Sequence, residues 1–226
     1  MLLHIPSVLT AAQVGECRKA LAAADWTDGR ATAGYLSSQV KNNAQVPEGH
    51  PVARRLGGMI LDALDVNQQF VSAALPLKVL PPLFNRYAGG QAYGGHIDGA
   101  IRPVLGTPHR IRTDLSATIF LSNPADYDGG ELVVEERFGS QRIKLPAGDM
   151  ILYPGTSVHK VEPVTRGERI ASFFWIQSMV REDFKRDILF EIDSAVQELG
   201  RDLPGNAALL RIAGAYHNLL RAWSDT

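Results

Sequence analysis

A histidine and an aspartate two residues apart, His96 and Asp98, are the side chains of this sequence that point most directly to metal chemistry. On a β-strand, residues i and i+2 face the same side of the sheet, so one imidazole nitrogen and one carboxylate oxygen could reach the same ion. A His-x-Asp pair also arises by chance, and it defines a site only when a further ligand can be found.

The best candidate for that further ligand is His159, which begins a predicted strand far along the chain. His109 is a weaker candidate because it falls in an irregular segment. Two neutral imidazoles and one carboxylate suit Fe(II), and on one face of an octahedron they leave three positions open. A structural zinc site would instead fill four positions with protein ligands. We therefore predict that His96, Asp98 and His159 bind a catalytic metal.

An arginine on the next predicted strand extends this hypothesis. Arg169 follows His159 across a turn and opens an otherwise apolar strand, where a buried cation needs an anionic partner. Its guanidinium would suit the distal carboxylate of a 2-oxo diacid whose other end chelates the metal. The alternative is an exposed arginine beside Glu168. Tyr87 could add a hydroxyl to the same carboxylate, or serve as a core or rim tyrosine.

The composition is that of an ordinary globular chain of 226 residues with a formal net charge of −1. This charge gives no electrostatic reason to expect nucleic acid or a membrane as a partner. A single cysteine excludes an internal disulfide framework and a thiolate-rich metal site. The N-terminal residues show no basic leader followed by a long apolar run, so we expect a cytoplasmic location.

Two amphipathic segments predict helices in the first third of the chain. The first begins after Thr10, a common helix-capping residue type, and ends near Ala24, with Cys17 on its apolar face as a buried thiol. The second spans residues 51–64.

Shorter segments in this part of the chain predict strands over residues 33–40, 70–75 and 77–87. The polar run 41–43 could line the mouth of a site, but a solvated loop is the favoured interpretation.

The centre of the chain predicts an all-β core. Residues 98–114 predict an irregular loop that acts as a lid or a substrate edge. Short strands with turn signals then recur, which is typical of a sandwich or barrel, here a jelly roll. The predicted strands cover residues 115–121, 131–135, 141–145, 150–153, 158–164 and 169–177.

The last part of the chain predicts two amphipathic helices. We therefore expect a mainly β fold with flanking helices: a jelly-roll domain over residues 1–179 and a helical appendage over 180–226. The appendage could pack against the barrel or form a homo-oligomer, and the sequence does not choose between these.

Taken together, these motifs resemble the prolyl 4-hydroxylase-type superfamily of Fe(II)- and 2-oxoglutarate-dependent dioxygenases, and more closely the bacterial PKHD-type hydroxylases. The resemblance covers essentially the whole chain. It is carried by Thr32-Ala33-Gly34, Lys41-Asn42-Asn43, Arg86-Tyr87, Gly94-Gly95-His96-Ile97-Asp98, Leu115 to Ser122, Gly129-Gly130-Glu131-Leu132, Gly148-Asp149-Met150, His159, Arg169 and the helical tail.

This resemblance implies a double-stranded β-helix, iron bound by the three predicted ligands, and 2-oxoglutarate bound by Arg169. Some related enzymes carry a serine two residues after this arginine, where the present chain has Ala171. Tyr87 or Thr118 would then take the role of that serine. The family also implies dioxygen as a co-substrate and L-ascorbate as the reductant that keeps iron in the Fe(II) state.

The leading hypothesis is a hydroxylase of a peptidyl or peptide-like substrate, with proline as one candidate acceptor and iron acquisition as a family-level context. One alternative is hydroxylation of a small molecule such as a siderophore or an amino acid. Another is a jelly-roll protein that senses iron or 2-oxoglutarate without turnover. A protein that only senses iron would not need Arg169.

Overall fold

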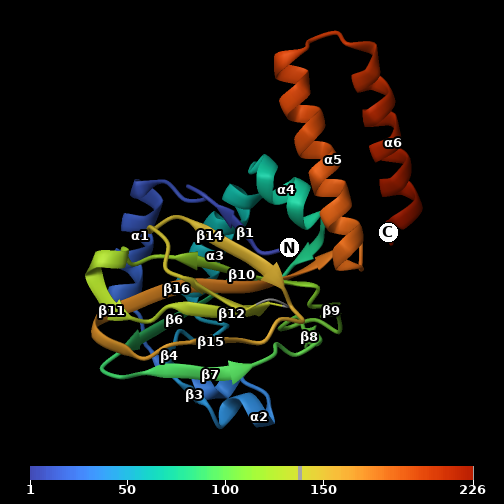
Figure 1. Cartoon of the computed structure of the whole chain (residues 1–226). Helices are drawn as coiled ribbons and strands as arrows, with labels where there is room; N and C mark the ends of the chain where they lie inside the picture. The colour runs from blue at the N-terminus through green and yellow to red at the C-terminus, as the bar shows by residue number, and fades with distance from the viewer. Residues whose placement is uncertain (137–138, 226) are drawn as a thin grey trace.

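Two antiparallel β-sheets lie face to face and form the body of the protein (Figure 1). The computed structural model describes residues 1–136 and 139–225. Within them, the larger sheet has the order β1 (Leu3–Ile5), β14 (Met150–Pro154), β10 (Leu115–Phe120), β16 (Val164–Ser178), β6 (Leu83–Ala88), β4 (Ala44–Gln45) and β2 (Thr27–Asp28), and β5 (Pro76–Val79) and β11 (Tyr127–Gly129) also pair with β16.

The smaller sheet supplies most of the predicted metal site. Its order in the described residues is β13 (Gly139–Ile143), β12 (Leu132–Glu136), β15 (His159–Val161), β7 (Ala92–His96) and β3 (Lys41–Asn42). The two sheets enclose a layer of buried side chains that includes Phe120, Leu132 and Tyr153. This is the jelly-roll core expected from the sequence.

The alternation of side chains along β10 separates the core from the site. Leu115, Ala117 and Ile119 belong to the apolar cluster on the outer side of the larger sheet. Ser116 and Thr118 alternate with them and line a cavity between the two sheets. Because successive strand residues point to opposite faces, one short strand can serve a dry core and a polar site together.

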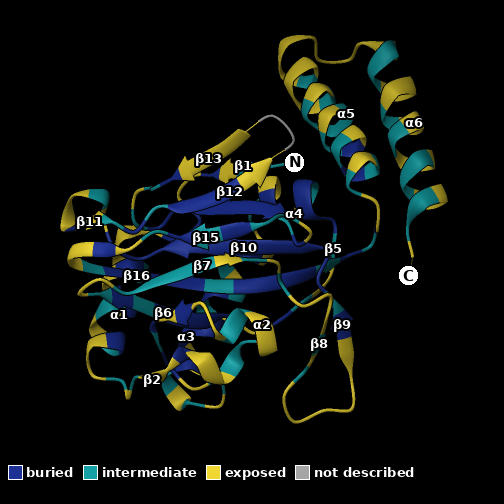
Figure 2. Cartoon of the chain, turned by 60° about the horizontal axis from the view of Figure 1, so that its bottom comes forward, coloured by how far each residue is buried: buried dark blue, intermediate teal, exposed yellow. Residues whose placement is uncertain are grey.

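Helices cover the outer face of the larger sheet (Figures 1 and 2). The helix expected after Thr10 is confirmed as α1 (Ala11–Ala22), and Thr10 forms a capping box with Gln13. Burial raises the pKa of the Cys17 thiol on its inner face to about 12. The second expected helix is confirmed as α3 (Pro51–Asp65), whose buried side chains pack into the same apolar cluster.

Two segments predicted as strands are helical. Residues 33–40 contain the short helix α2 (Tyr35–Ser38), and residues 70–75 lie mostly in α4 (Gln68–Ala74). The Asn67 side chain accepts a hydrogen bond from the Phe70 N–H and so begins α4, a local signal that the apolar run obscured.

The segment 98–114, predicted as an irregular loop, forms a β-hairpin. Its strands are β8 (Ile101–Pro103) and β9 (Arg110–Arg112), which pair with each other and with no strand of the two main sheets among the described residues. The hairpin extends away from the body of the protein (Figure 2). Of the β8 side chains, Arg102 lines the cavity.

The C-terminal helices α5 (Asp183–Asp202) and α6 (Ala207–Trp223) form an antiparallel pair that rises away from the sheets (Figure 1). The base of α5 is held by the buried Arg186, which donates to the carbonyls of Val180 and Arg181 at 2.7 and 2.8 Å and pairs with Asp183. Within the described residues, no helix combines the length and apolar composition needed to cross a membrane.

Gly129 offers a test of how tightly the end of β11 packs against the chain next to it. It has φ +71°, and an added Cβ would lie 2.0 Å from the carbonyl oxygen of Pro163. We expect Gly129→Ala to lower the free energy of unfolding by about 2 kcal/mol or more, measured by urea denaturation, because the change adds both backbone strain and overlap.

Gly15→Ala is the matched control. Gly15 lies in α1, and an added Cβ would meet no atom within 4 Å, so the same substitution should be neutral or stabilising by about 0.5–1 kcal/mol. Equal stability of the two variants would contradict the steric argument.

Candidate functional site

The three predicted metal ligands come together between the sheets. Strand pairing sets His159 on β15 directly opposite His96 on β7, and their ring centroids lie 4.2 Å apart. Asp98 follows β7, with its Oδ1 4.0 Å from His96 Nε2 and its Oδ2 3.7 Å from His159 Nε2. One donor atom from each residue lies within 4.8 Å of the others. These distances suit three ligands around one ion.

The hydrogen bonds of the two imidazoles orient their lone pairs toward this common point. His96 Nδ1 lies 2.8 Å from the Gly94 carbonyl oxygen, and His159 Nδ1 lies 3.0 Å from the Ser157 carbonyl oxygen. A carbonyl only accepts, so each Nδ1 carries the proton and each Nε2 keeps its lone pair. Backbone carbonyls in this position are the usual partners of metal-binding histidines.

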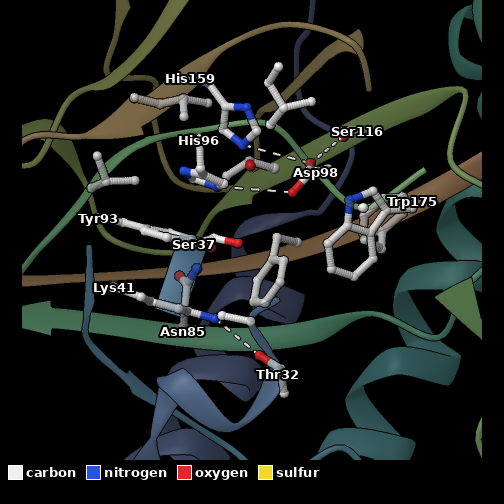
Figure 3. Close-up of a pocket in the computed structure, with 18 of the residues that line it drawn as sticks. Thr32, Ser37, Lys41, Asn85, Tyr93, His96, Asp98, Ser116, His159 and Trp175 are labelled. Carbon is white, nitrogen blue, oxygen red and sulfur yellow. Dashed lines mark hydrogen bonds and ion pairs between the residues drawn. The ribbon is translucent and has the colours of Figure 1, made fainter. Parts of the chain in front are cut away.

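Neighbouring side chains hold the group in place (Figure 3). Ser116 Oγ donates to Asp98 Oδ2 at 2.7 Å from the facing sheet. The Tyr93 ring stacks on His96 with centroids 3.6 Å apart. Burial, followed by the neighbouring His159, lowers the pKa of His96 to about 4, so this imidazole is neutral at pH 7 and free to bind a cation.

Arg169 is buried deep in the same cavity, with 1% of its surface exposed. This excludes the alternative of an exposed arginine at the start of the strand. Its guanidinium lies 5.5 Å from the Tyr87 ring centroid and 5.2 Å from that of Phe120. Among the described residues, its Nε and Nη1 have no hydrogen-bond partner. A buried cation with two free donors is suited to a carboxylate ligand.

The register of β16 relates this arginine to the metal site. Arg169 pairs with Tyr87 on β6. Phe173 lies four residues further along β16 and pairs with Thr118 on β10. Trp175 then pairs with Ser116, the residue that holds Asp98. The strand therefore runs from the free guanidinium to the level of the three ligands.

Both predicted helpers of Arg169 line the cavity. Tyr87 is fully buried, and burial raises the pKa of its phenol. Thr118 is 5% exposed and sits between the levels of Arg169 and Asp98. Ala171, two residues after Arg169 on β16, is buried and carries no hydroxyl.

Sequence reasoning missed several side chains of the site. The run 41–43 is not a solvated loop, because Lys41 and Asn43 are buried and Lys41 lines the cavity. Ser116 was also missed, although its spacing of two from Thr118 in an apolar strand was a usable signal. Arg102 enters from the hairpin, which the sequence did not predict. His109 is exposed and does not line this cavity.

Comparison with known families agrees with this geometry. Residues 82–177 match the 2OG-Fe(II) oxygenase superfamily, and residues 183–225 match the PKHD-type hydroxylase C-terminal domain. Together with the jelly roll and the His-Asp-His cluster, these matches define an oxygenase of the class that depends on iron and 2-oxoglutarate.

A relative that matches over its full length identifies the family within this class. A PKHD-type hydroxylase of Bordetella pertussis is 58% identical over 225 residues, covering 100% of both chains. The chain therefore belongs to the PKHD-type hydroxylase family and is a 2-oxoglutarate-dependent dioxygenase.

Two solved structures share the fold at low sequence identity. A Pseudomonas putida prolyl-4-hydroxylase is 20% identical with a TM-score of 0.53, over 78% of this chain and 92% of that one. HygX from Streptomyces hygroscopicus, solved with nickel, 2-oxoglutarate and hygromycin B, is 17% identical with a TM-score of 0.52, over 80% and 84%. These likenesses support the jelly-roll architecture.

The hydrogen bond from Ser116 to Asp98 predicts a measurable effect on metal affinity. We expect Ser116→Ala to weaken binding of Fe(II) or Mn(II) by about 10- to 100-fold, because the carboxylate loses the partner that orients it. Anaerobic metal titration followed by calorimetry would measure the change.

The control is Ser140→Ala, which removes a hydroxyl from an exposed strand residue and should leave the affinity unchanged. Wild-type affinity in a folded Ser116→Ala protein would show that this hydrogen bond does not support the metal site.

Proposed function

We propose that His96, Asp98 and His159 bind Fe(II), that Arg169 binds the distal carboxylate of 2-oxoglutarate, and that the enzyme hydroxylates a peptide-like substrate. The donor set fits the metal, since two neutral imidazoles and one carboxylate are the ligands of non-haem Fe(II) oxygenases. Membership of the family supports both the iron and the co-substrate.

The observation that carries this proposal is the free guanidinium of Arg169 in the cavity of the three ligands. An arginine buried to 1% exposure without a hydrogen-bond partner for Nε and Nη1 in the described structure would be costly unless an anion enters. A 2-oxo diacid meets this need because it carries a carboxylate at its far end and a chelating group at the other. Thr118 and Tyr87 lie beside its path and contribute hydroxyls.

The side chains of the site have separate roles. The two histidines and Asp98 would hold the metal through one donor atom each, and three protein ligands would leave coordination positions for the reactants. Their Nδ1 hydrogen bonds and Ser116 fix ligand orientation, while the aromatic and apolar walls limit access of water. Bound iron with 2-oxoglutarate supplies the oxidising chemistry, which the protein itself lacks.

The acceptor of the oxygen is a peptidyl or peptide-like group, with proline as the first candidate. The fold likeness to a prolyl-4-hydroxylase supports this choice. Hydroxylation of a small molecule is the second candidate, since HygX shares the fold and was solved with hygromycin B. L-ascorbate as the reductant and a role in iron acquisition complete the proposal, both by analogy with the family.

Arg169→Ala tests the co-substrate assignment. Under anaerobic conditions, Fe(II) and 2-oxoglutarate should give a weak visible charge-transfer band in the wild-type protein. The variant should keep iron but need at least about 10- to 100-fold more 2-oxoglutarate for the same band, because it loses charge-assisted hydrogen bonds to the distal carboxylate.

Two further variants complete the test. Arg166→Ala removes an exposed arginine from the same strand and should behave as wild type, whereas His159→Ala should lose iron. The assignments would be wrong if Arg169→Ala released the iron while His159→Ala retained it. Succinate release with peptide and small-molecule pools, with mass spectrometry for a gain of one oxygen, would identify the acceptor.

A further inference from the structure

Two cationic side chains line the cavity away from Arg169. Lys41 lies on β3 beside Tyr93, and Arg102 lies on β8 against Trp175. Neither belongs to the three-ligand cluster or to the wall around Arg169. Among the described residues, neither has a carboxylate oxygen within 4.0 Å, whereas several other partly buried cations of this protein do have such a partner.

The environment of Lys41 satisfies only part of its ammonium group. The residue is 6% exposed, and Nζ donates to Thr32 Oγ1 at 3.0 Å and to Gln45 Oε1 at 3.2 Å. Both acceptors are neutral, and an ammonium has three protons to donate. Burial, and then the charge of Arg102, lowers the pKa of Lys41 to about 8. An anion beside this ammonium would offset the desolvation.

A second polar group faces the same space. Asn85 is 8% exposed and lines the cavity, and its Oδ1 has no hydrogen-bond partner in the described part of the chain. Figure 3 shows this amide beside Lys41 and below Tyr93. Its NH₂ group provides a neutral donor next to the ammonium. The unpaired Oδ1 is an acceptor that a carboxylate cannot satisfy, so it needs an N–H or O–H donor from another part of the substrate or from water.

Arg102 forms the outer part of this cationic wall. Its guanidinium carbon lies 4.0 Å from the centroid of the Trp175 ring, which fixes its plane at the cavity edge. Burial lowers its pKa, while the nearby charges of Glu48 and Asp98 oppose this effect. The stacked position leaves the edge of the guanidinium, with its N–H groups, available to an anion.

The position of this wall separates it from the proposed 2-oxoglutarate pocket. On β16, Trp175 is six residues from Arg169, which corresponds to roughly 20 Å along a strand. Lys41 lies over the Tyr93 ring at 5.2 Å, and Tyr93 in turn stacks on His96. Arg102 is therefore placed far along β16 from Arg169, while Lys41 is connected to His96 through the Tyr93 ring.

We propose that the primary substrate carries a carboxylate and that Lys41 and Arg102 bind it at the cavity mouth while its reacting carbon faces the metal. This inference rests on the proposed function, and it defines the substrate class as an anionic one. A peptide-like molecule with a free carboxylate fits it, whereas an uncharged peptide segment does not. Asn85 donates the neutral hydrogen bond in this site.

The test uses two probes that differ only in charge, N-acetylglycinate and N-acetylglycinamide. Their binding to the full-length protein is measured by ligand-observed NMR, with saturating 2-oxoglutarate and Mn(II) so that Arg169 is already occupied. The carboxylate should bind saturably and the amide at least about tenfold more weakly. Lys41→Met and Arg102→Gln should each weaken carboxylate binding by about tenfold or more, as expected for a lost charge-assisted hydrogen bond.

Two controls isolate the effect of these charges. Lys41→Arg should restore much of the affinity, because it keeps the positive charge. Lys78→Met removes a lysine from an exposed position outside the cavity and should bind the carboxylate as wild type does. The proposal is overturned if the carboxylate does not bind saturably, if both probes bind equally, or if both cavity variants keep wild-type affinity.

The test of the cationic site can be distinguished from the test of the proposed function. Carboxylate binding is repeated in Arg169→Ala protein without metal or 2-oxoglutarate, where it should persist because its site does not include Arg169. Persistence there together with no charge-transfer band in the wild type would refute the co-substrate assignment and retain the cationic site. A normal band with no carboxylate binding would refute the cationic site alone.

Discussion

The antiparallel pairing of β15 with β7 is the constraint on which the site depends. It sets two histidines from distant parts of the chain opposite each other on neighbouring strands, so that their rings lie close together. Asp98 can join them because it lies just beyond the end of β7, where its carboxylate can bend toward both rings. A shift of one residue in this register would turn His159 to the other face and dismantle the cluster.

The stacking of the two sheets adds a second requirement. The smaller sheet carries the candidate ligands His96 and His159, while the larger sheet provides Ser116, Thr118 and Arg169. These polar groups lie in a layer that is otherwise apolar, where each unpaired donor is costly. A ligand in the cavity would satisfy these groups, and the unpaired Nε and Nη1 of Arg169 are the clearest sign of this need in the described residues.

Secondary elements outside the jelly roll shape what can reach the metal. The β8–β9 hairpin carries Arg102 to the cavity edge, and the short strand β3 buries Lys41 beside Tyr93. Arg102 stacks on Trp175, six residues along β16 from Arg169, and we propose that the cavity binds two anions in separate places. An enzyme that binds a dicarboxylate and a second anionic molecule needs such a separation, since like charges in one pocket would repel each other.

The sequence alone determined the residue types of the centre, because the His-x-Asp spacing and an arginine in an apolar segment are visible without the fold. The structure places Asp98 just beyond β7 and Arg169 within β16 rather than at its start. The sequence also determined α1, whose cap at Thr10 is a local interaction. The burial of Lys41 and the position of Arg102 at the cavity were decided only by the tertiary structure. A short segment does not encode which sheet will cover it, and that contact sets its exposure and its role.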